Sequence, residues 1–109
     1  MFGDMMASES DRIGELTIED LGRVIAPLAA KYNITKVYLF GSRARGDYTR
    51  DSDYDFVIEV TPEYRWDDHV DFIESASKAL NSNVDVVTRR SLTDDNFSKD
   101  VLREMIYVC

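Results

Sequence analysis

The sequence predicts an α/β (α+β) domain in which helices flank a small mixed β-sheet. Segments with helical periodicity alternate with short runs of β-branched and aromatic residues, and the connections between them are short. The chain has 109 residues, which is enough for one hydrophobic core and too few for a second catalytic domain. It contains no internal repeat, linker or low-complexity tract, so we expect a single folded unit.

Residues 1–15 are polar and lack apolar periodicity, which predicts a flexible N-terminal segment before a folded domain over residues 16–109. Thr17 is a candidate N-cap for the first helix, with Asp20 three residues later. An apolar stripe at helical spacing follows, and Pro27 within it is expected either to kink the helix or to split it. The stripe consists of Leu21, Val24, Ile25, Leu28 and Tyr32.

Short segments rich in β-branched and aromatic residues predict the strands. The first of them stops at Gly41, and the residues that follow are expected to form a short helix over 42–46. The second ends before Pro62. The predicted strands are 36–40, 54–60, 84–88 and a short terminal strand at 107–108.

Two further helices complete the prediction. One runs from about Tyr64 or Trp66 to Leu80, and the last follows a cap at Asp94 or Asp95. The apolar side of the last helix is expected to carry Phe97, Val101, Leu102, Met105 and Ile106. Large apolar side chains on these helices are expected in the core rather than at a cofactor site: Trp66, Phe72, Ile73, Phe97 and Met105.

Charge and cysteine content exclude several classes of protein. The formal net charge of −8 argues against a long nucleic acid as partner, although a nucleotide carried by Mg²⁺ is compatible with it. Cys109 is the only cysteine, which excludes an internal disulfide and a cysteine-based metal cluster and fits a reducing compartment. The sequence has no secretory signal and no stretch long enough to cross a bilayer. We therefore expect a soluble, cytoplasmic protein.

A Gly-Ser turn after the first strand is a candidate phosphate site. Gly41 permits a sharp turn and a close approach of the backbone to a ligand, and the Ser42 hydroxyl can bind phosphate oxygens together with backbone N–H groups. The turn is not a Walker A loop, because no Gly-Lys-Ser or Gly-Lys-Thr follows it. Arg43 and Arg45 can contact phosphate or a partner, or lie in solvent, and the sequence does not decide between these.

Acidic residues on two of the strands predict a metal site. Asp53 and Asp55 are two residues apart, so their carboxylates are expected side by side, about 7 Å apart on one face of the strand. Like charges at that separation repel each other, and a divalent cation between them removes the conflict; oxygen ligands suit Mg²⁺. Asp85 lies in an otherwise apolar strand, where a charged side chain costs free energy unless it has a partner or a function. If the two strands are neighbours, Asp85 joins the pair.

Three carboxylates can hold two metal ions for in-line attack of a hydroxyl on an α-phosphorus. In this interpretation Asp85 draws the proton from the attacking hydroxyl or ligates the metal that lowers its pKa. Asp53 and Asp55 bridge both ions, and Ser42 holds the β- and γ-phosphates.

At these residues the chain resembles the minimal nucleotidyltransferases (MNT type) of the DNA polymerase beta superfamily. The matching stretches are Gly41-Ser-Arg-Ala-Arg-Gly46, Ser52-Asp-Tyr-Asp55 and Val84-Asp-Val86, and the order of elements agrees from about Thr17 to the C-terminus.

The resemblance implies a polymerase-beta-type fold for the domain at 16–109, with a mixed sheet of three or four strands. It also implies Mg²⁺ dependence and transfer of AMP from ATP. Members of this size are often antitoxins that silence a HEPN ribonuclease toxin by adding AMP to one of its tyrosines. The expected site residues are, for catalysis and metal binding, Asp53, Asp55 and Asp85 and, for the nucleotide, Gly41, Ser42 and Arg43.

Other functions remain open at this point. The chain can instead be a non-catalytic antitoxin that neutralises its partner by occlusion, or a small-molecule adenylyltransferase subunit whose pocket is completed by a homo-oligomer or a second protein. Templated polymerisation is disfavoured by the acidic charge. His69, the only histidine, is expected at the surface. Base preference, acceptor and oligomeric state are not determined by the sequence.

Overall fold

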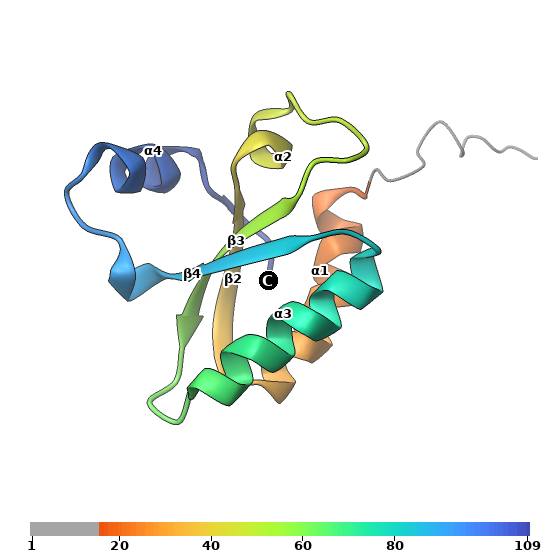
Figure 1. Cartoon of the computed structure of the whole chain (residues 1–109), viewed down its shortest axis with the longest axis vertical. Helices are drawn as coiled ribbons and strands as arrows, with labels where there is room; N and C mark the ends of the chain where they lie inside the picture. The colour runs from red at the N-terminus through yellow and green to blue at the C-terminus, as the bar shows by residue number, and fades with distance from the viewer. Residues whose placement is uncertain (1–15) are drawn as a thin grey trace, which may run out of the picture.

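The computed structural model describes residues 16–109 and confirms a mixed four-stranded sheet with helices packed against it (Figure 1). The expected flexible segment 1–15 lies outside the described residues. Along the chain the elements are α1 (Ile18–Lys31), β2 (Ile34–Phe40), α2 (Ser42–Arg45), β3 (Tyr54–Val60), α3 (Trp66–Leu80), β4 (Val84–Thr88), the 3₁₀ helix η2 (Arg89–Ser91), α4 (Asn96–Glu104) and β5 (Ile106–Tyr107).

The strands are ordered β4-β3-β2-β5 across the sheet. β2 runs antiparallel to both β3 and β5, whereas β3 and β4 are parallel and are joined by α3. The register pairs Phe40 with Asp55, and Asp55 with Asp85. Gly41, which follows β2, therefore lies at the same end of the sheet as Asp55 on β3 and Asp85 on β4.

α1 and α3 lie side by side over one face of the sheet (Figure 1). Leu21 and Ile25 from α1 pack with Phe72 and Ala76 from α3 against Phe56 of β3, and all five side chains are buried. This face carries the main hydrophobic core, so it fixes the positions of the strands that bear the acidic residues.

The start of α1 agrees with the sequence prediction, and its interior shows whether Pro27 splits the helix. Thr17 is the N-cap, and its hydroxyl accepts a hydrogen bond from the backbone N–H of Asp20 at 3.0 Å. Pro27 lies inside α1, and the helix continues through it to Lys31 rather than being split. Amphipathic packing of this helix against the sheet thus outweighs the backbone hydrogen bond that a proline removes.

The opposite face of the sheet is covered by α4. Alternate residues of β3 point to opposite faces, so Val57 belongs to a second, smaller cluster together with Phe40 and with Val101 of α4. Asp95 caps α4 by accepting a hydrogen bond from the Ser98 backbone N–H at 2.7 Å. Because α4 has only nine residues, it leaves part of this face open.

Several expectations about apolar residues are corrected. Phe72 is buried as predicted, but Trp66 is 73% exposed and Phe97 is 55% exposed, so neither belongs to the core. Trp66 stacks on His69, with ring centroids 5.2 Å apart. His69 is partly buried rather than fully at the surface, and the Tyr64 hydroxyl lies 2.5 Å from its Nδ1.

Two strand bounds and one short helix differ from the sequence prediction. β2 begins at Ile34 rather than at residue 36, β5 at Ile106 rather than at 107, and η2 was not predicted from the sequence. Within residues 16–109, no helix combines the length and the apolar character needed to cross a membrane.

Candidate active site

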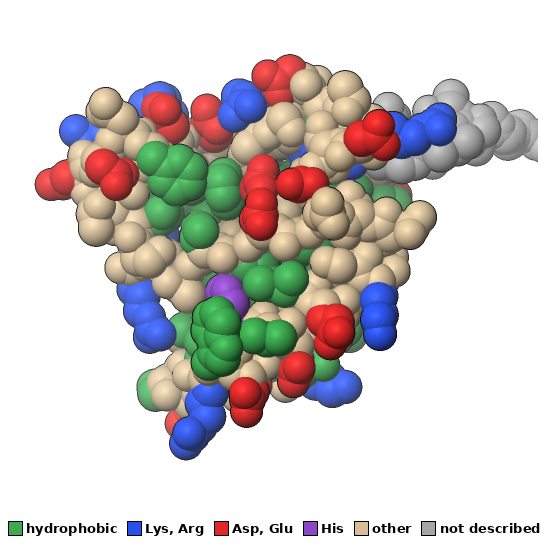
Figure 2. All heavy atoms as spheres, viewed as in Figure 1, with side chains coloured by type: hydrophobic (Ala, Val, Ile, Leu, Met, Phe, Trp, Pro, Cys, Tyr) green, Lys and Arg blue, Asp and Glu red, His purple; other side chains and the backbone are tan. Residues whose placement is uncertain are grey.

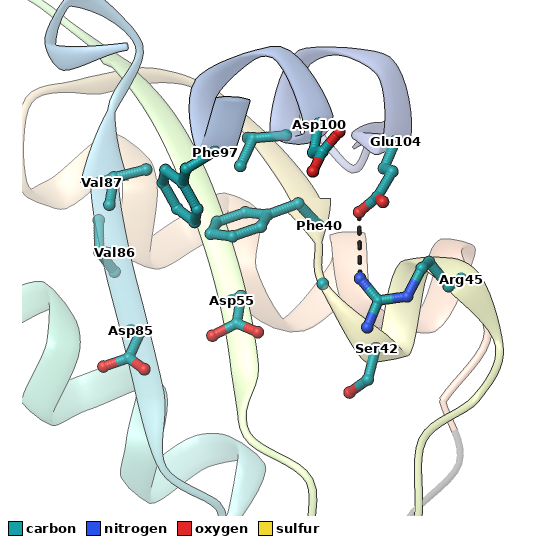
Figure 3. Close-up of a pocket in the computed structure, with 12 residues that line it drawn as sticks. Phe40, Ser42, Arg45, Asp55, Asp85, Val86, Val87, Phe97, Asp100 and Glu104 are labelled. Atoms are coloured by element: carbon teal, nitrogen blue, oxygen red, sulfur yellow. Dashed lines mark hydrogen bonds and ion pairs between the residues drawn. The ribbon is translucent and has the colours of Figure 1, made fainter. Parts of the chain in front are cut away.

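A cavity of about 670 Å³ opens on the face of the sheet that α4 only partly covers. Figure 2 shows acidic and hydrophobic side chains lying next to each other on this side of the molecule, and Figure 3 shows the residues that line the cavity. The ends of β2, β3 and β4 form its floor, and α2 and α4 form its walls. Its lining consists of Phe40, Gly41, Ser42, Arg45, Asp55, Asp85, Val86, Val87, Phe97, Asp100, Val101 and Glu104.

The turn between β2 and α2 requires glycine for two reasons. Gly41 has a φ of +76°, which L-residues with a side chain rarely adopt. A Cβ atom at Gly41 would lie 2.3 Å from Oδ2 of Asp55, far inside the van der Waals limit. The absence of a side chain thus lets the Asp55 carboxylate pack directly against the backbone of the turn.

Asp55 and Asp85 form the centre of the cavity. They are register partners on the neighbouring parallel strands β3 and β4, so their side chains leave the sheet on the same face. Figure 3 shows the two carboxylates side by side on the cavity floor. Asp55 is partly buried and Asp85 is exposed. The tertiary structure therefore brings together two acidic residues that are thirty positions apart in the sequence.

Asp53 is placed differently from the other two acidic residues. β3 begins at Tyr54, so Asp53 is the last residue of the preceding loop, and it does not line the cavity. Its charge still repels the Asp55 carboxylate and helps to raise the pKa of that group. Among residues 16–109, no group of three or more His, Cys, Asp or Glu side chains has the geometry to hold a metal ion. The structure thus aligns two of the three predicted carboxylates and leaves the third beside them.

The environment of Asp55 disfavours its charged form. Burial raises the pKa of the Asp55 carboxyl above its usual value, and the charges of Asp85 and then Asp53 raise this pKa further, whereas Arg45 lowers it. Two neighbouring oxygen donors that repel each other suit a hard divalent cation, since Mg²⁺ is commonly held by one or two carboxylates. The residues present therefore fit a magnesium site.

We expect the Asp55 carboxyl to release its proton at a higher pH than an ordinary aspartate, as measured by an NMR pH titration of its carboxyl carbon. Asp85→Asn should lower this pKa, because Asp85 raises it more than Asp53 does, and Arg45→Gln should raise it, because Arg45 lowers it. Asp51→Asn, which removes an exposed carboxylate from the preceding loop, is the matched control and should change little. An unchanged pKa in Asp85→Asn would contradict the coupling of the two carboxylates.

Ser42, which the sequence predicted as a phosphate ligand, is one of the residues that line the cavity. It is the first residue of α2, and it is partly buried. Its hydroxyl has no hydrogen-bond partner among the side chains and backbone of residues 16–109. A partly buried hydroxyl facing a cavity in this way is available to bind a ligand oxygen.

Arg43, which was expected to bind the nucleotide, does not line the cavity. Its Nε and Nη2 donate to the carbonyl oxygen of Ser52 at 3.1 and 2.8 Å, and its guanidinium lies 4.0 Å from the centroid of the Tyr54 ring and 5.0 Å from that of Tyr48. These contacts hold the loop before β3 in place. Arg43 therefore supports the position of Asp53 and Asp55 from outside the cavity.

Arg45 takes the place in the cavity that was expected for Arg43. Successive residues of a helix are rotated by about 100°, so two residues two positions apart point in nearly opposite directions. The Nη1 of Arg45 lies 3.2 Å from Oε1 of Glu104 on α4, and its Nε lies 3.3 Å from Oδ2 of Asp47. In Figure 3 the guanidinium lies between Glu104 and Ser42. Within residues 16–109, its Nη2 has no protein acceptor.

The wall contributed by α4 was not anticipated from the sequence. α4 supplies Phe97 and Val101 as apolar lining and Asp100 and Glu104 as acidic lining. Helical periodicity does indicate which residues of α4 share a face, but it gave no indication that this face meets the Gly-Ser turn. Only the packing of α4 on the sheet shows that it belongs to the site.

The sequence and fold have clear relatives. Residues 23–109 match the family described as polymerase beta, nucleotidyltransferase. A candidate protein adenylyltransferase of Methanocaldococcus jannaschii, MJ1379, is 32% identical over 83 residues, which cover 74% of this chain and 83% of that protein. A solved structure of a candidate minimal nucleotidyltransferase aligns with a TM-score of 0.69 at 29% identity, covering 84% of this chain and 96% of the other.

A more distant neighbour shares the fold. A chain in the structure of a tri-AMPylated Shewanella oneidensis HEPN toxin in complex with an MNT antitoxin aligns with a TM-score of 0.63 at 19% identity. The alignment covers 85% of this chain and 72% of that one.

Proposed function

Because this chain belongs to the polymerase beta nucleotidyltransferase family, we propose that it transfers AMP from ATP to a tyrosine hydroxyl of a HEPN ribonuclease toxin. In this role it is a cytoplasmic, Mg²⁺-dependent protein adenylyltransferase that acts as the antitoxin, with residues 16–109 as the catalytic domain. The observation that carries the proposal is the pair of carboxylates, Asp55 and Asp85, beside the Gly41-Ser42 turn in one cavity.

The triphosphate is bound at the α2 side of the cavity. The Ser42 hydroxyl donates to a phosphate oxygen, and Arg45 directs its Nη2 toward the same region. On α4 the lining carries the acidic side chain of Asp100, which repels phosphate, whereas Glu104 is paired with Arg45. The β- and γ-phosphates are therefore held at α2, and the α-phosphorus comes to lie near Asp55.

The two neighbouring carboxylates, with Asp53 beside them, would hold two Mg²⁺ ions. When bound, these ions neutralise the triphosphate charge and lower the pKa of the attacking hydroxyl. The protein supplies the arrangement of the donors: Gly41 lets Asp55 sit against the turn, and the register of β3 and β4 fixes Asp85 next to it.

The reaction forms one bond and breaks another at the α-phosphorus. The acceptor oxygen bonds to this phosphorus, the bond to the β-phosphate bridging oxygen breaks, and pyrophosphate leaves toward Ser42 and Arg45. The acceptor proton passes to a carboxylate oxygen of Asp85, which is the more exposed of the pair. All three residues line the same cavity, so no large rearrangement of the fold is required.

The choice of a protein acceptor, and of a toxin in particular, is supported by the relatives. The M. jannaschii relative is named as a candidate protein adenylyltransferase, and the S. oneidensis neighbour is a complex in which the HEPN toxin is AMPylated. The family resemblance carried by the Gly-Ser turn and the spaced aspartates implies the same kind of acceptor.

The proposal is tested by incubating the full chain with α-labelled ATP, Mg²⁺ and a purified HEPN-type ribonuclease. We expect label on a tyrosine of that protein, located by mass spectrometry. Asp85→Asn should lower the rate by about 10²- to 10⁴-fold because it removes the proton acceptor. Asp51→Asn, an exposed acid outside the cavity, is the control and should label normally. Loss of toxin activity without any label, equal in wild type and Asp85→Asn, would support occlusion instead.

A further inference from the structure

We propose that Phe97 and Val87 seat the aromatic ring of the acceptor, so that the cavity selects a phenolic hydroxyl over an aliphatic one. This inference rests on the proposed function, because it names the recognition element for the acceptor of that same reaction. It concerns the β4 side of the cavity, whose apolar lining has no part in binding the triphosphate or the metal ions.

The first step of the argument is the order of groups along the cavity floor. Gly41 follows β2, Asp55 is on β3 and Asp85 is on β4, and these three strands are consecutive neighbours. Neighbouring strands lie about 4.8 Å apart. In an in-line displacement the attacking and leaving oxygens are on opposite sides of the phosphorus. Because pyrophosphate leaves at the β2 side, the acceptor hydroxyl must enter at the β4 side, next to Asp85.

The second step is access from solvent. In the order β4-β3-β2-β5, β4 is an edge strand of the sheet. Asp85 is exposed on this edge, whereas Asp55 on the neighbouring inner strand is partly buried. A side chain that projects from a large protein can therefore reach Asp85 from the β4 edge of the sheet without passing over the inner strands.

The third step is the surface that this side chain would meet. Val87 is two residues after Asp85 on the same face of β4, about 7 Å along the strand. Phe97 of α4 lies opposite it and makes an edge contact with Phe40, with ring centroids 6.2 Å apart. Figure 3 shows the Phe97 ring between Val87 and Phe40, above the two aspartates. An aromatic ring entering here would cover the exposed part of Phe97.

The shape of the wall favours a phenol. The hydroxyl of tyrosine stands at the far end of a planar apolar ring, so the ring can lie against Val87 and Phe97 while the oxygen reaches Asp85. A serine or threonine hydroxyl is one bond from its Cβ atom, so such a side chain would reach Asp85 without covering Val87 or Phe97 and would gain no apolar contact with this wall. A ring in this position also gains aromatic contact with Phe97.

The test measures binding of small acceptor analogues, so it does not depend on turnover. The full chain, saturated with Mg²⁺ and a non-hydrolysable ATP analogue, is titrated with N-acetyltyrosinamide and, separately, N-acetylserinamide, while amide and methyl resonances are followed by NMR. We expect the tyrosine analogue alone to shift the Val87 methyl resonances. Phe97→Ala should raise its dissociation constant about three- to tenfold and leave the affinity for the ATP analogue unchanged.

Two variants control for loss of an aromatic ring and for folding. Trp66→Ala removes another highly exposed aromatic side chain outside the cavity and should bind the tyrosine analogue like wild type. Phe97→Leu keeps the apolar surface without the ring and should lie between wild type and Phe97→Ala. The inference is overturned if the tyrosine analogue fails to bind, if Phe97→Ala binds it normally, or if Phe97→Ala weakens the ATP analogue, which would place the base on this wall.

The two proposals fail in different ways. If the tyrosine analogue binds at Phe97 but no AMP is transferred to the HEPN protein, the proposed function is wrong. If AMP is transferred to the HEPN protein at the same rate by Phe97→Ala and wild type, the acceptor site lies elsewhere and the transferase function stands.

Discussion

Replacement of Asp55 by asparagine is expected to abolish AMP transfer and to raise the thermal stability of the protein. Asparagine keeps the size of the side chain but removes the negative charge, so the site loses its central cation ligand. We expect the rate of transfer to fall by about 10³-fold or more. A loss of this size, with a folded and more stable protein, distinguishes a functional group from a structural one.

The gain in stability follows from the pKa of Asp55, which burial raises above its value in the unfolded chain. Between these two pKa values the folded state binds more protons than the unfolded state, so stability falls as the pH rises through this interval. At neutral pH the charged carboxylate therefore costs stability, and asparagine removes the cost. The melting temperature of Asp55→Asn should exceed that of wild type by a few degrees at pH 7.

The comparison has two internal controls. The difference in melting temperature should shrink below the pH at which an ordinary aspartate is protonated, because wild type then carries no charge at Asp55. Addition of Mg²⁺ should stabilise wild type and leave Asp55→Asn unaffected. A variant that is less stable than wild type at pH 7, or that still gains stability from Mg²⁺, would show that Asp55 is not an unsatisfied, cation-binding carboxylate.

Gly41→Ala should have the second large effect, through the same carboxylate. The φ of +76° and ψ of −156° at Gly41 lie in a region that is essentially restricted to glycine, and occupying it with alanine costs about 1–3 kcal/mol. The new Cβ would also lie 2.3 Å from Oδ2 of Asp55, so the carboxylate must move away from the turn. We expect a lower melting temperature and a rate of transfer reduced about 10²-fold or more.

Gly46→Ala is the matched control for this variant. Gly46 has a φ of +92°, but a Cβ there would meet no atom within 4 Å. Gly46 is in the left-handed helical region, so alanine there is also strained but makes no contact with Asp55. This variant should lose stability while retaining most of the transfer activity. Equal losses of activity in the two variants would show that the turn acts through its rigidity alone. Combining Gly41→Ala with Asp55→Asn should add little further loss of rate, since both act on one group.

The sequence predicts the elements well where the signal is local. The bounds of β3 and β4 agree with the prediction to the residue, because each strand is rich in β-branched residues and directly follows turn-forming residues. The N-cap at Thr17 was found for the same reason, and Asp95 was one of two adjacent candidates for the cap of α4, since a cap depends on a few adjacent residues. The family resemblance, carried by the Gly-Ser turn and the spaced aspartates, is also confirmed.

The errors concern residues whose role depends on distant parts of the chain. Phe97 is a large apolar residue of a type that is usually buried in the core. However, α4 is short and leaves the Phe97 ring at the edge of a cavity. Arg43 and Arg45 stand in one motif, and Arg43 was the one expected at the nucleotide, whereas Arg45 lines the cavity. The helical rotation of about 200° between them shows that only one can face the site, and the packing of α2 against β2 decides that it is Arg45.

By itself, the sequence determined the elements, the family and the acidic and glycine residues from which a nucleotide site can be built. These depend on local propensity and on the spacing of a motif, both of which are properties of the chain alone. The tertiary structure decided which of these groups lie close together. Strand register brings Asp55 next to Asp85, and the packing of α4 brings Glu104 to Arg45. Asp53 lies in the loop before β3 and does not line the cavity. Contacts between residues that are distant in the sequence depend on how separate elements pack, and no short segment of sequence contains that information.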